Sequence, residues 1–317
     1  MKRTALAALL MALAAGPAAG PAVADRISDI RNTLHNLSVT GPGEVRATTE
    51  DELCVYCHTP HGASSEPATP LWNRDLSGAT YIPYQSSSLD TIGIGQPGGT
   101  SKLCLSCHDG TIAIGSVNVL NGAATDGNPS TPDIILSGTG LGGTIPEGSG
   151  ASTGFTRRLG TDLTNDHPIS FTYNDALALQ DGELRLPSAT PEIDNRVPGV
   201  RPAVPLIDDQ LQCTACHDPH IRDTIEPDIK FLRLNRLQQS EPLQGAFDAT
   251  RDQICLACHE KEGWVGSAHA NSSVANEVYE STAAALRDFS NALPVWRAGC
   301  LNCHDTHTVE GARRLLR

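Results

Sequence analysis

The stretch Cys54-Val-Tyr-Cys57-His58 sets a pattern that recurs four more times along a chain of 317 residues. Every cysteine of the sequence, ten in all, belongs to a C-x-x-C pair, and a histidine follows each pair directly. The other four copies are Cys104-Leu-Ser-Cys107-His108, Cys213-Thr-Ala-Cys216-His217, Cys255-Leu-Ala-Cys258-His259 and Cys300-Leu-Asn-Cys303-His304. Because the chain has only 11 histidines, a chance histidine after all five pairs has a probability below about one in a million, so the repeat needs a chemical reason.

The C-x-x-C-H spacing is typical of c-type haem attachment. Two thiols one helical turn apart can bond the two vinyl groups of a porphyrin, and the next residue brings an imidazole to the iron as proximal ligand. Four-thiolate zinc sites use the pairs two at a time, which leaves one pair over. A thioredoxin-like redox pair would occur once, and structural disulfides give no reason for the histidines. We therefore expect five covalently attached haems, bound by these ten cysteines and five proximal histidines.

The second axial ligand of each iron is also expected to be a histidine. Both methionines, Met1 and Met11, lie at the extreme N-terminus, so His/Met ligation is excluded for the rest of the chain. The candidate distal ligands are the six histidines outside the motifs, namely His35, His61, His167, His220, His269 and His307. Six candidates for five positions allow every haem to be bis-histidine with one imidazole to spare, and they leave the pairing open.

Three of these candidates share one placement, three residues after a proximal histidine: His61, His220 and His307. Pro60 and Pro219 cannot continue a helix begun by the haem motif. The chain should turn there and carry the second imidazole towards a neighbouring iron.

The other three candidates are isolated in the sequence. His167 lies in Asn165-Asp166-His167-Pro168 and His269 in Ser267-Ala268-His269. His35 flanks an apolar series at positions 27, 30, 34 and 37, a spacing that predicts a helix face.

These motifs resemble the multihaem c-type cytochromes with doubled C-x-x-C-H segments, related to the cytochrome c3-like proteins. The three C-x-x-C-H-x-x-H segments carry the resemblance, together with Pro70-Leu71-Trp72-Asn73-Arg74 and Asn165-Asp166-His167-Pro168-Ile169-Ser170-Phe171. The resemblance implies haems packed in near-contacting pairs, bis-histidine irons and little regular secondary structure. Several such proteins carry electrons in the periplasm or at the cell surface of metal-respiring bacteria, and some polymerise into conductive filaments.

Composition favours the same kind of fold. Aromatic residues make up only 4 % of the chain, while glycine and proline number 29 and 21, so the side-chain core should be thin and the backbone irregular. We expect mostly irregular coil with a few short α-helices wrapped around a stack of covalent haems, and little β structure. Short helices should carry the motifs, and one longer helix is predicted over 274–293, capped by Ser272 or Ser273 and ended by Pro294.

The order of motifs along the chain suggests its organisation. Residues 1–24 resemble a signal peptide, with Lys2 and Arg3, an apolar run from position 5 to 15 and the cleavage pattern Ala22-Val23-Ala24. We expect export and no membrane span in the mature chain. A two-haem region over 25–115, a Gly/Ser/Thr-rich insertion over 116–160 and a three-haem region over 161–317 should follow.

The expected function is electron transfer rather than catalysis, because a bis-histidine iron has no open position for substrate. A formal net charge of −13 argues against nucleic acid as a partner and favours redox proteins with a basic docking face, or extracellular electron acceptors. One alternative is a haem enzyme of the nitrite or hydroxylamine type, although the C-x-x-C-K motif of the pentahaem nitrite reductases is absent. Another is a structural subunit of an extracellular filament. Whether the protein is periplasmic or extracellular stays open.

Overall fold

The computed structural model describes residues 26–65, 71–91, 93–147, 157–194, 202–223, 230–307, 309 and 314–316. The expected signal peptide over 1–24 lies outside the described residues. Within the described ranges no helix has the length and apolar character needed to cross a bilayer.

Regular secondary structure is sparse and short. The longest helix, α1, has 10 residues. The α-helices are α1 (Gly99–His108), α2 (Asp175–Asp181), α3 (Cys213–Cys216), α4 (Cys255–Cys258), α5 (Ser281–Ala285) and α6 (Val295–Ala298). The 3₁₀ turns are η1 (Ile30–Asn32), η2 (Leu141–Gly143), η3 (Pro187–Ala189), η4 (Ala268–Ala270) and η5 (Gly299–Asn302). The expectation of mostly irregular coil with a few short helices is confirmed for the described residues.

The strands are equally short, and they pair segments that are mostly far apart in sequence. They are β1 (Arg26–Ser28), β2 (Arg46–Ala47), β3 (Val119–Leu120), β4 (Ala123–Ala124), β5 (Leu136–Ser137), β6 (Phe171–Thr172), β7 (Gln210–Leu211) and β8 (Ile221–Asp223). In the described part of the chain the strands form four two-stranded antiparallel sheets: β1 with β8, β2 with β5, β3 with β4 and β6 with β7. The β1–β8 sheet ties the start of the described chain to the third C-x-x-C-H segment.

The predicted helix over 274–293 is wrong. Only α5 lies in this range, and α6 begins directly after Pro294. Asn271 Oδ1 accepts hydrogen bonds from the backbone of Ser273 and Val274, which closes a turn where the helix was expected to start. Glu277 then accepts from the Val295 backbone, so the chain runs extended beside the segment that follows Pro294. Proline, with its fixed φ, here precedes a helix rather than ending one.

The helix face predicted from positions 27, 30, 34 and 37 is wrong as well. The first of these residues lies in strand β1 and the second in the single turn η1. Ile27 and Leu34 remain 43 % and 60 % exposed, so the apolar series buries no continuous face. Pairing with β8 has replaced the local helical preference in this segment.

The apolar core is divided into small clusters, and each of the four larger ones includes the middle residues of a C-x-x-C pair. Val55 and Tyr56 lie in one cluster and Leu105 in a second. Ala215, Leu256 and Ala257 share the largest cluster, and Leu301 belongs to a fourth. Because these middle residues point into the core, each motif is packed from one side.

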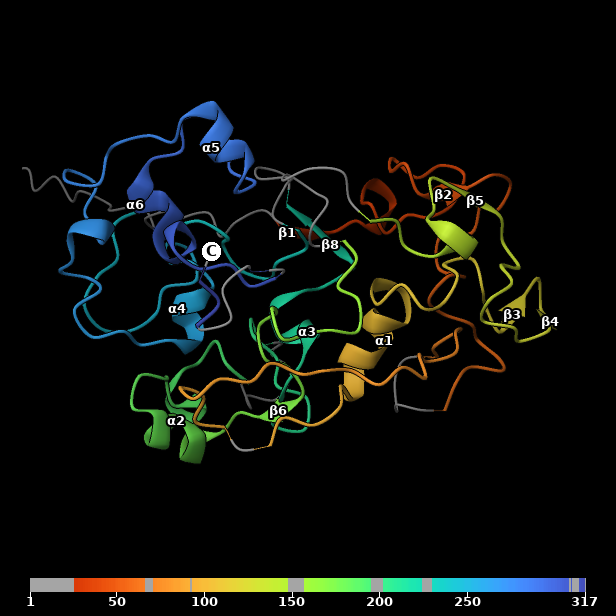
Figure 1. Cartoon of the computed structure of the whole chain (residues 1–317), viewed down its shortest axis with the longest axis horizontal. Helices are drawn as coiled ribbons and strands as arrows, with labels where there is room; N and C mark the ends of the chain where they lie inside the picture. Colours follow the sequence, from red (N-terminus) through yellow and green to blue (C-terminus); the bar gives the residue numbers. More distant parts are fainter. Residues whose placement is uncertain are drawn as a thin grey trace, which may run out of the picture.

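The glycine-rich segment from position 116 takes part in this packing. Val117 and Ile134 are buried in the cluster that contains Tyr56, and β5 pairs with β2. Gly115 approaches Ile134 so closely that a Cβ would lie 1.9 Å from its carbonyl oxygen. The described part of this segment is therefore built into the N-terminal end of the molecule, where Figure 1 shows β2 to β5 together.

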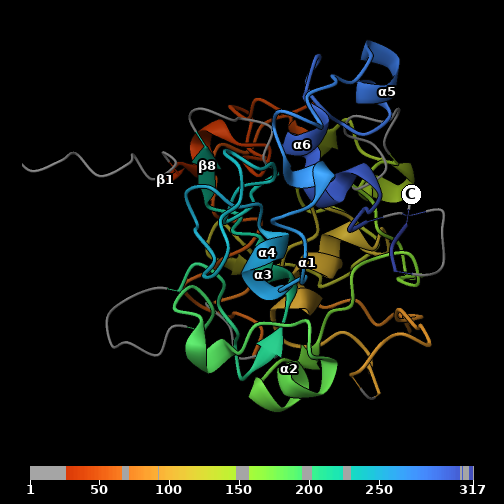
Figure 2. The same cartoon turned by 90° about the vertical axis from the view of Figure 1, so that its left-hand side faces the viewer.

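The C-x-x-C-H segments follow one another along the molecule. Figure 1 shows α1, α3, α4 and α6 in succession from the middle towards the end opposite β3 and β4. In Figure 2, turned by 90°, α4, α3 and α1 overlap near the centre of the picture. The two views agree that α1, α3 and α4 form a row along the long axis.

Candidate functional site

Each C-x-x-C-H segment, here numbered motif 1 to motif 5 in chain order, forms a single helical turn. The histidine backbone N–H donates to the carbonyl of the first cysteine at 2.8–2.9 Å in motifs 1, 3, 4 and 5, and motif 2 forms the end of α1. Residues three apart on a helical turn share a face, so both thiols point to the same side. All ten cysteines are free thiols in this structure.

In motifs 1, 3, 4 and 5 a second segment of the chain passes beside the motif histidine after this turn. Isolated bridges join His58 to Trp72, His217 to Leu232, His259 to Leu184 and His304 to Leu316. In motif 2 the His108 carbonyl accepts instead from the Leu159 backbone at 2.8 Å. The passing segment fixes the backbone that carries each imidazole.

Neighbouring motifs lie close enough for their thiols to affect one another. Burial raises the pKa of Cys57 to about 12, and Cys107 of motif 2 adds to the shift. Burial likewise raises the pKa of Cys258 to about 12, with a further contribution from Cys216 of motif 3. The thiols of motifs 1 and 2 are therefore neighbours, as are those of motifs 3 and 4.

In two other pairs of motifs the thiols are coupled to each other. The interaction between Cys104 and Cys213 raises the pKa of Cys104 and lowers that of Cys213. Cys255 and Cys300 are coupled in the same way. The five motifs therefore form one continuous row whose order in space is their order in the sequence.

Two glutamines fasten these motif contacts. Gln212, directly before Cys213, accepts from Ser101 Oγ at 2.5 Å, and Ser101 Oγ accepts from the Cys213 backbone at 3.0 Å. Gly99 makes this approach feasible, since its φ is +48° and a Cβ there would lie 2.9 Å from Gln212 Nε2. Gln253 Oε1 accepts from the Cys300 backbone at 3.0 Å. Gln212 thus connects motifs 2 and 3, and Gln253 connects motifs 4 and 5.

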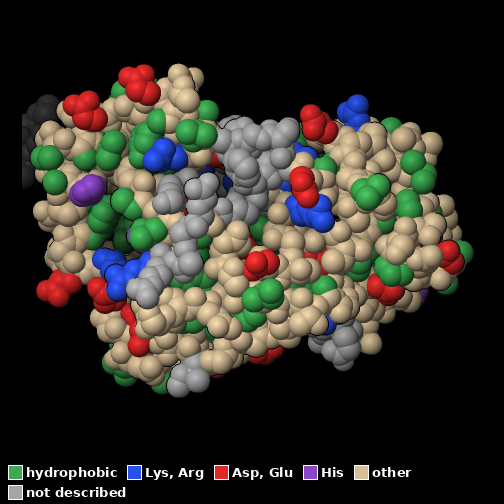
Figure 3. Space-filling view, viewed as in Figure 1, with side chains coloured by type: hydrophobic (Ala, Val, Ile, Leu, Met, Phe, Trp, Pro, Cys, Tyr) green, Lys and Arg blue, Asp and Glu red, His purple; other side chains and the backbone are tan. Residues whose placement is uncertain are grey.

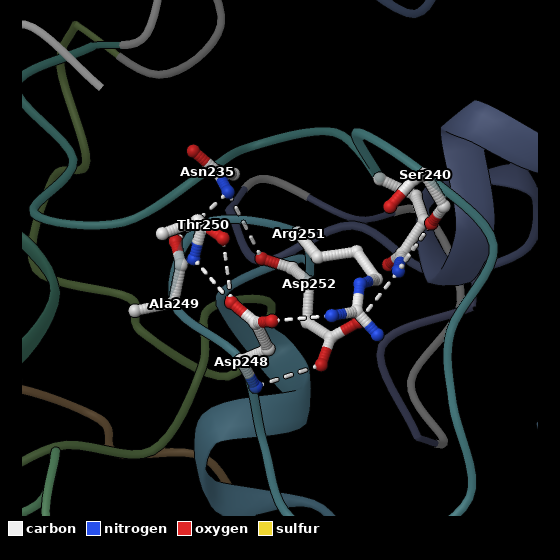
Figure 4. Close-up of polar contacts among 8 residues, drawn as sticks. Asn235, Ser240, Asp248, Ala249, Thr250, Arg251 and Asp252 are labelled. Carbon is white, nitrogen blue, oxygen red and sulfur yellow. Dashed lines mark hydrogen bonds and ion pairs between the residues drawn. The ribbon is translucent and has the colours of Figure 1, made fainter. Parts of the chain in front are cut away.

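Figure 4 shows the polar loop around Asp248 and Asp252, directly before Gln253 in the sequence. Asp252 accepts from Gln238 Nε2 at 2.7 Å and from the Asp248 backbone at 2.9 Å. Gln238 Oε1 in turn accepts from the Gln253 backbone at 3.0 Å. This buried network positions the start of α4 and, through Gln253, the start of motif 5.

The imidazoles of the sequence meet in pairs that join different parts of the chain. The pairs and their ring-centroid distances are His58–His220 at 6.1 Å, His35–His108 at 6.2 Å, His217–His307 at 6.3 Å and His167–His259 at 6.4 Å. Each pair combines one motif histidine with one histidine from outside the motifs. Neither His220 nor His307 pairs with the motif that precedes it in sequence.

The ring-centroid distances of the four pairs are close to the distance expected for two imidazoles bound to one metal ion. With a metal–nitrogen bond of about 2.0 Å and about 1.1 Å from that nitrogen to the ring centre, two imidazoles on opposite sides of one metal ion have centroids about 6.2 Å apart. All four observed distances lie within 0.2 Å of this value. The pairs are therefore spaced as trans axial ligands, and the four remaining positions of an octahedral metal would have to come from another group.

Hydrogen bonds at Nδ1 fix the tautomer of several rings. His108, His217 and His304 meet the carbonyls of Arg157, Lys230 and Arg314 at 2.7–2.8 Å, and His167 meets that of Pro168 at 2.9 Å. A carbonyl can only accept, so Nδ1 carries the proton and Nε2 keeps the lone pair that a metal needs. Burial also lowers the pKa of His217 and His259 to about 4. Burial therefore favours the neutral form of His217 and His259.

Two rings outside the motifs meet carboxylates instead. His220 Nδ1 lies 3.0 Å from Asp218 Oδ1, and His307 Nδ1 lies 2.9 Å from Asp166 Oδ1. The hydrogen bond with His220 lowers the pKa of Asp218 to about 2. Burial lowers the pKa of His307, but Asp166, together with Cys213 and Asp305, raises it above its ordinary value on balance.

No protein-family model matches this chain. A comparison with curated proteins finds no relative either. Its function has to be inferred from the geometry of the motifs and imidazole pairs.

Two histidines outside the motifs, His61 and His269, remain as candidate ligands for motif 5. Among the described residues neither remaining candidate, His61 or His269, has a ring contact with another imidazole, and both are exposed. η4, which carries His269, packs against α6, and α6 leads directly into motif 5. His61 follows motif 1 at the other end of the row. His269 is therefore the nearer candidate for motif 5, and His61 fits the expected spare histidine.

Several buried donors in the row have no partner among the described protein atoms. They are Tyr56 Oη, Trp72 Nε1, Arg74 Nε, Trp264 Nε1, Arg287 Nε and His35 Nδ1. Arg74 is only 1 % exposed, and its terminal nitrogens donate to the carbonyls of Ile114, Ala113 and Ser106 rather than to a carboxylate. A buried cation without a protein anion, among unpaired donors, fits a bound group with acidic substituents.

Sequence reasoning did not find the residues that orient the rings. The three carbonyls that hold His108, His217 and His304 each belong to a basic residue two positions before a leucine: Arg157-Arg158-Leu159, Lys230-Phe231-Leu232 and Arg314-Leu315-Leu316. This recurring basic-x-Leu pattern could have been recognised. Asp166, which lies 141 residues from His307, had no comparable signal.

Proposed function

We propose that the protein is a pentahaem c-type cytochrome that relays electrons along a row of bis-histidine haems. The observation that carries this proposal is the set of four imidazole pairs, each 6.1–6.4 Å apart and each containing the histidine of a C-x-x-C-H motif. When bound, each haem would supply a one-electron Fe(III)/Fe(II) couple and the four equatorial nitrogens that the pairs lack.

The residues of the chain have distinct tasks in this proposal. The ten thiols would form the thioether bonds, and His58, His108, His217, His259 and His304 would be the proximal ligands. His220, His35, His307 and His167 would be distal ligands to motifs 1, 2, 3 and 4, with His269 serving motif 5. The unpaired buried donors, Arg74 above all, suit haem propionates, which are anionic hydrogen-bond acceptors.

The row of motifs supports a relay rather than five separate sites. Thiol contacts between motifs 2 and 3 and between motifs 4 and 5 would bring successive haems next to each other. Cys54 and Cys303, in the two outermost motifs, are the only exposed cysteines. Electrons would enter and leave at these two ends.

The surface and the N-terminus bear on partners and location. Figure 3 shows acidic side chains spread over one face instead of gathered in one patch, in keeping with the net charge of −13. This suits salt-sensitive encounters with basic redox proteins, or with an extracellular acceptor. Because c-type attachment and the pattern over residues 1–24 both suit an exported protein, we place it in the periplasm or outside the cell.

A haem enzyme is the second candidate, and motif 5 is the specific reason to consider it. Both His304 and Cys303 of this motif are exposed, so this end of the row is open to solvent. If His269 did not bind, the fifth iron would keep an open position where a small oxidised nitrogen substrate could react. His269→Ala, compared with the unaltered protein, separates the two functions: the relay requires CO binding to increase in the variant, whereas an open fifth site binds CO equally in both.

The test of the proposed function is to count haems and their ligands in the purified protein. Intact-mass measurement and a pyridine haemochrome assay should give five covalent haems per chain. Electron paramagnetic resonance of the oxidised protein should give only low-spin bis-imidazole signals. A colourless protein, or one with fewer haems than motifs, would overturn the proposal.

A further inference from the structure

The hydrogen-bond partners of Nδ1 divide the imidazole pairs into two classes. His220 and His307 meet carboxylates, while His108, His217, His304 and His167 meet backbone carbonyls. The carboxylates therefore belong to the pairs of motifs 1 and 3, which alternate in the row with motifs 2 and 4. His35, in the pair of motif 2, has a buried Nδ1 with no described partner.

Asp218 is built to hold its position beside His220. The residue is 8 % exposed, and its Oδ1 accepts from both the backbone N–H and the ring of His220, at 3.1 and 3.0 Å. Its other oxygen forms an ion pair with Arg233 at 3.2 Å. Arg233 is itself anchored, because its Nε donates to the Thr214 carbonyl at 2.8 Å. The carboxylate cannot turn away from the ring without losing all of these contacts.

Asp166 is held as firmly on a different part of the chain. It is 4 % exposed, and its backbone donates to the Leu163 carbonyl at 3.2 Å. With its amide oriented to satisfy its hydrogen bonds, Asn165 donates to Asp166 Oδ2 at 3.0 Å, which leaves Oδ1 for His307. The His167 backbone donates to the Thr306 carbonyl at 2.9 Å, so this segment is paired with the one that carries His307.

A carboxylate changes an axial imidazole more than a carbonyl does. It attracts the Nδ1 proton strongly, so the ring gains imidazolate character and donates more electron density to its metal. Extra electron density stabilises Fe(III) relative to Fe(II) and so lowers the reduction potential. The effect is larger at buried positions because water screens it less.

We propose that Asp166 and Asp218 are positioning residues that lower the reduction potentials of the haems at motifs 3 and 1. The inference rests on the proposed function, because it requires haems at these pairs. In each step one iron would go from Fe(II) to Fe(III) as its neighbour in the row goes from Fe(III) to Fe(II), and the Nδ1 proton would stay in the hydrogen bond between ring and carboxylate. The haems of motifs 1 and 3 thereby become the stronger donors, interleaved with those of motifs 2 and 4.

The test uses the haem-loaded chain with Asp166→Asn, Asp218→Asn and a control. Asp109→Asn is the control, since Asp109 is a buried carboxylate directly after His108 whose described bonds go to Tyr81 and Thr111, not to a ring. Redox titration with dithionite, followed by absorbance, gives the potentials. Electron paramagnetic resonance gives the ligand field of each low-spin iron.

Each Asp→Asn change at 166 or 218 should raise one potential so that the ratio of Fe(II) to Fe(III) at that haem increases about tenfold, equivalent to about 59 mV. The g values of one low-spin signal should change together with this potential. Asp109→Asn should change the potentials and the g values less. Asp166→Glu and Asp218→Glu keep a carboxylate and should restore part of the original potential. Unchanged potentials and g values in a variant that retains five haems would overturn the inference. Absence of haem from the unaltered chain would instead contradict the proposed function.

Discussion

The segments after motif 1 and after motif 3 have the same spacing but different positions in the molecule. Both read histidine, x, proline, histidine, with Thr59 in one and Asp218 in the other. His220 lies 6.1 Å from His58, with the two rings at 15°. His61, at the equivalent position, has no ring contact with another described imidazole. A shared local motif therefore does not decide which histidine becomes a ligand.

The contacts of the chain around each of these histidines account for the difference. His220 leads directly into β8, which pairs with β1, and its carbonyl accepts from the Asp29 backbone at 2.9 Å. Asp218 orients its ring. After motif 1, Thr59 Oγ1 donates to the His61 carbonyl at 2.8 Å and so fixes the backbone without touching the ring. Long-range pairing, rather than the proline turn, carries His220 to motif 1.

Removing all haems should abolish the difference between these segments. With Ser at all ten cysteine positions, the chain should stay largely unfolded, because its apolar clusters are small and the row of motifs would have no common group to pack against. Far-UV circular dichroism should lose most native signal, and limited proteolysis should cut after Lys230 and Arg74 with equal ease. Native-like dichroism in this variant would show that the side chains alone specify the fold.

Replacing His220 and His61 one at a time tests whether these two equivalent histidines have different roles. His220→Ala should convert about one-fifth of the iron from low-spin to high-spin and open that iron to CO, because the iron at motif 1 loses its distal ligand. His61→Ala is the matched control and should leave all five irons low-spin. The measurement is electron paramagnetic resonance with CO difference spectra. Equal effects of both changes would contradict the pairing given by the structure.

The anchoring of motif 1 can be weakened separately. Asn73 is fully buried, and its amide donates to the Val55 and Val119 carbonyls at 2.7 and 2.9 Å. Asn73→Ala leaves these groups unpaired, at a cost of about 3 kcal/mol in local stability. Hydrogen exchange should become faster around motif 1 and in the segment with His61, but not around motif 3.

Asn235→Ala provides the reciprocal control for this change. Asn235 donates to the Ala249 and Asp252 carbonyls at 3.1 and 3.3 Å, in the loop before motif 4. Faster exchange should then appear around α4 and leave motif 1 unaffected. If both variants loosened the whole chain equally, the two ends would unfold as one cooperative unit.

The features that could be read from the sequence are those encoded within a few residues. The C-x-x-C-H spacing predicts a helical turn with two thiols on one side, and the structure has this turn in all five motifs. Low aromatic content with abundant glycine and proline predicted the sparse secondary structure. The predicted helix over 274–293 failed because Asn271 and the strand-like pairing with residues 295 and 296 outweighed the local preference.

The pairing of imidazoles could not be read in this way. His307 meets His217 from 90 positions away, and His35 reaches motif 2 because β1 pairs with β8. Asp166 orients a ring that belongs to another part of the chain. These relations depend on how distant segments pack, for which a single sequence carries no local signal.

A substitution at the β1–β8 contact is expected to have the smallest effect. Arg222 of β8 donates to Asp29 Oδ2 from both Nε and Nη2, at 2.9 and 2.7 Å. Asp29→Ala removes this partly exposed ion pair but keeps the backbone bond from residue 29 to the His220 carbonyl. His220 should stay on its iron, with only a slight rise in CO binding that disappears in high salt, where the original ion pair is also screened. CO titration at low and high ionic strength measures this rise. A loss of low-spin iron as large as that of His220→Ala would mean that the ion pair, rather than the backbone pairing, holds the ligand in place.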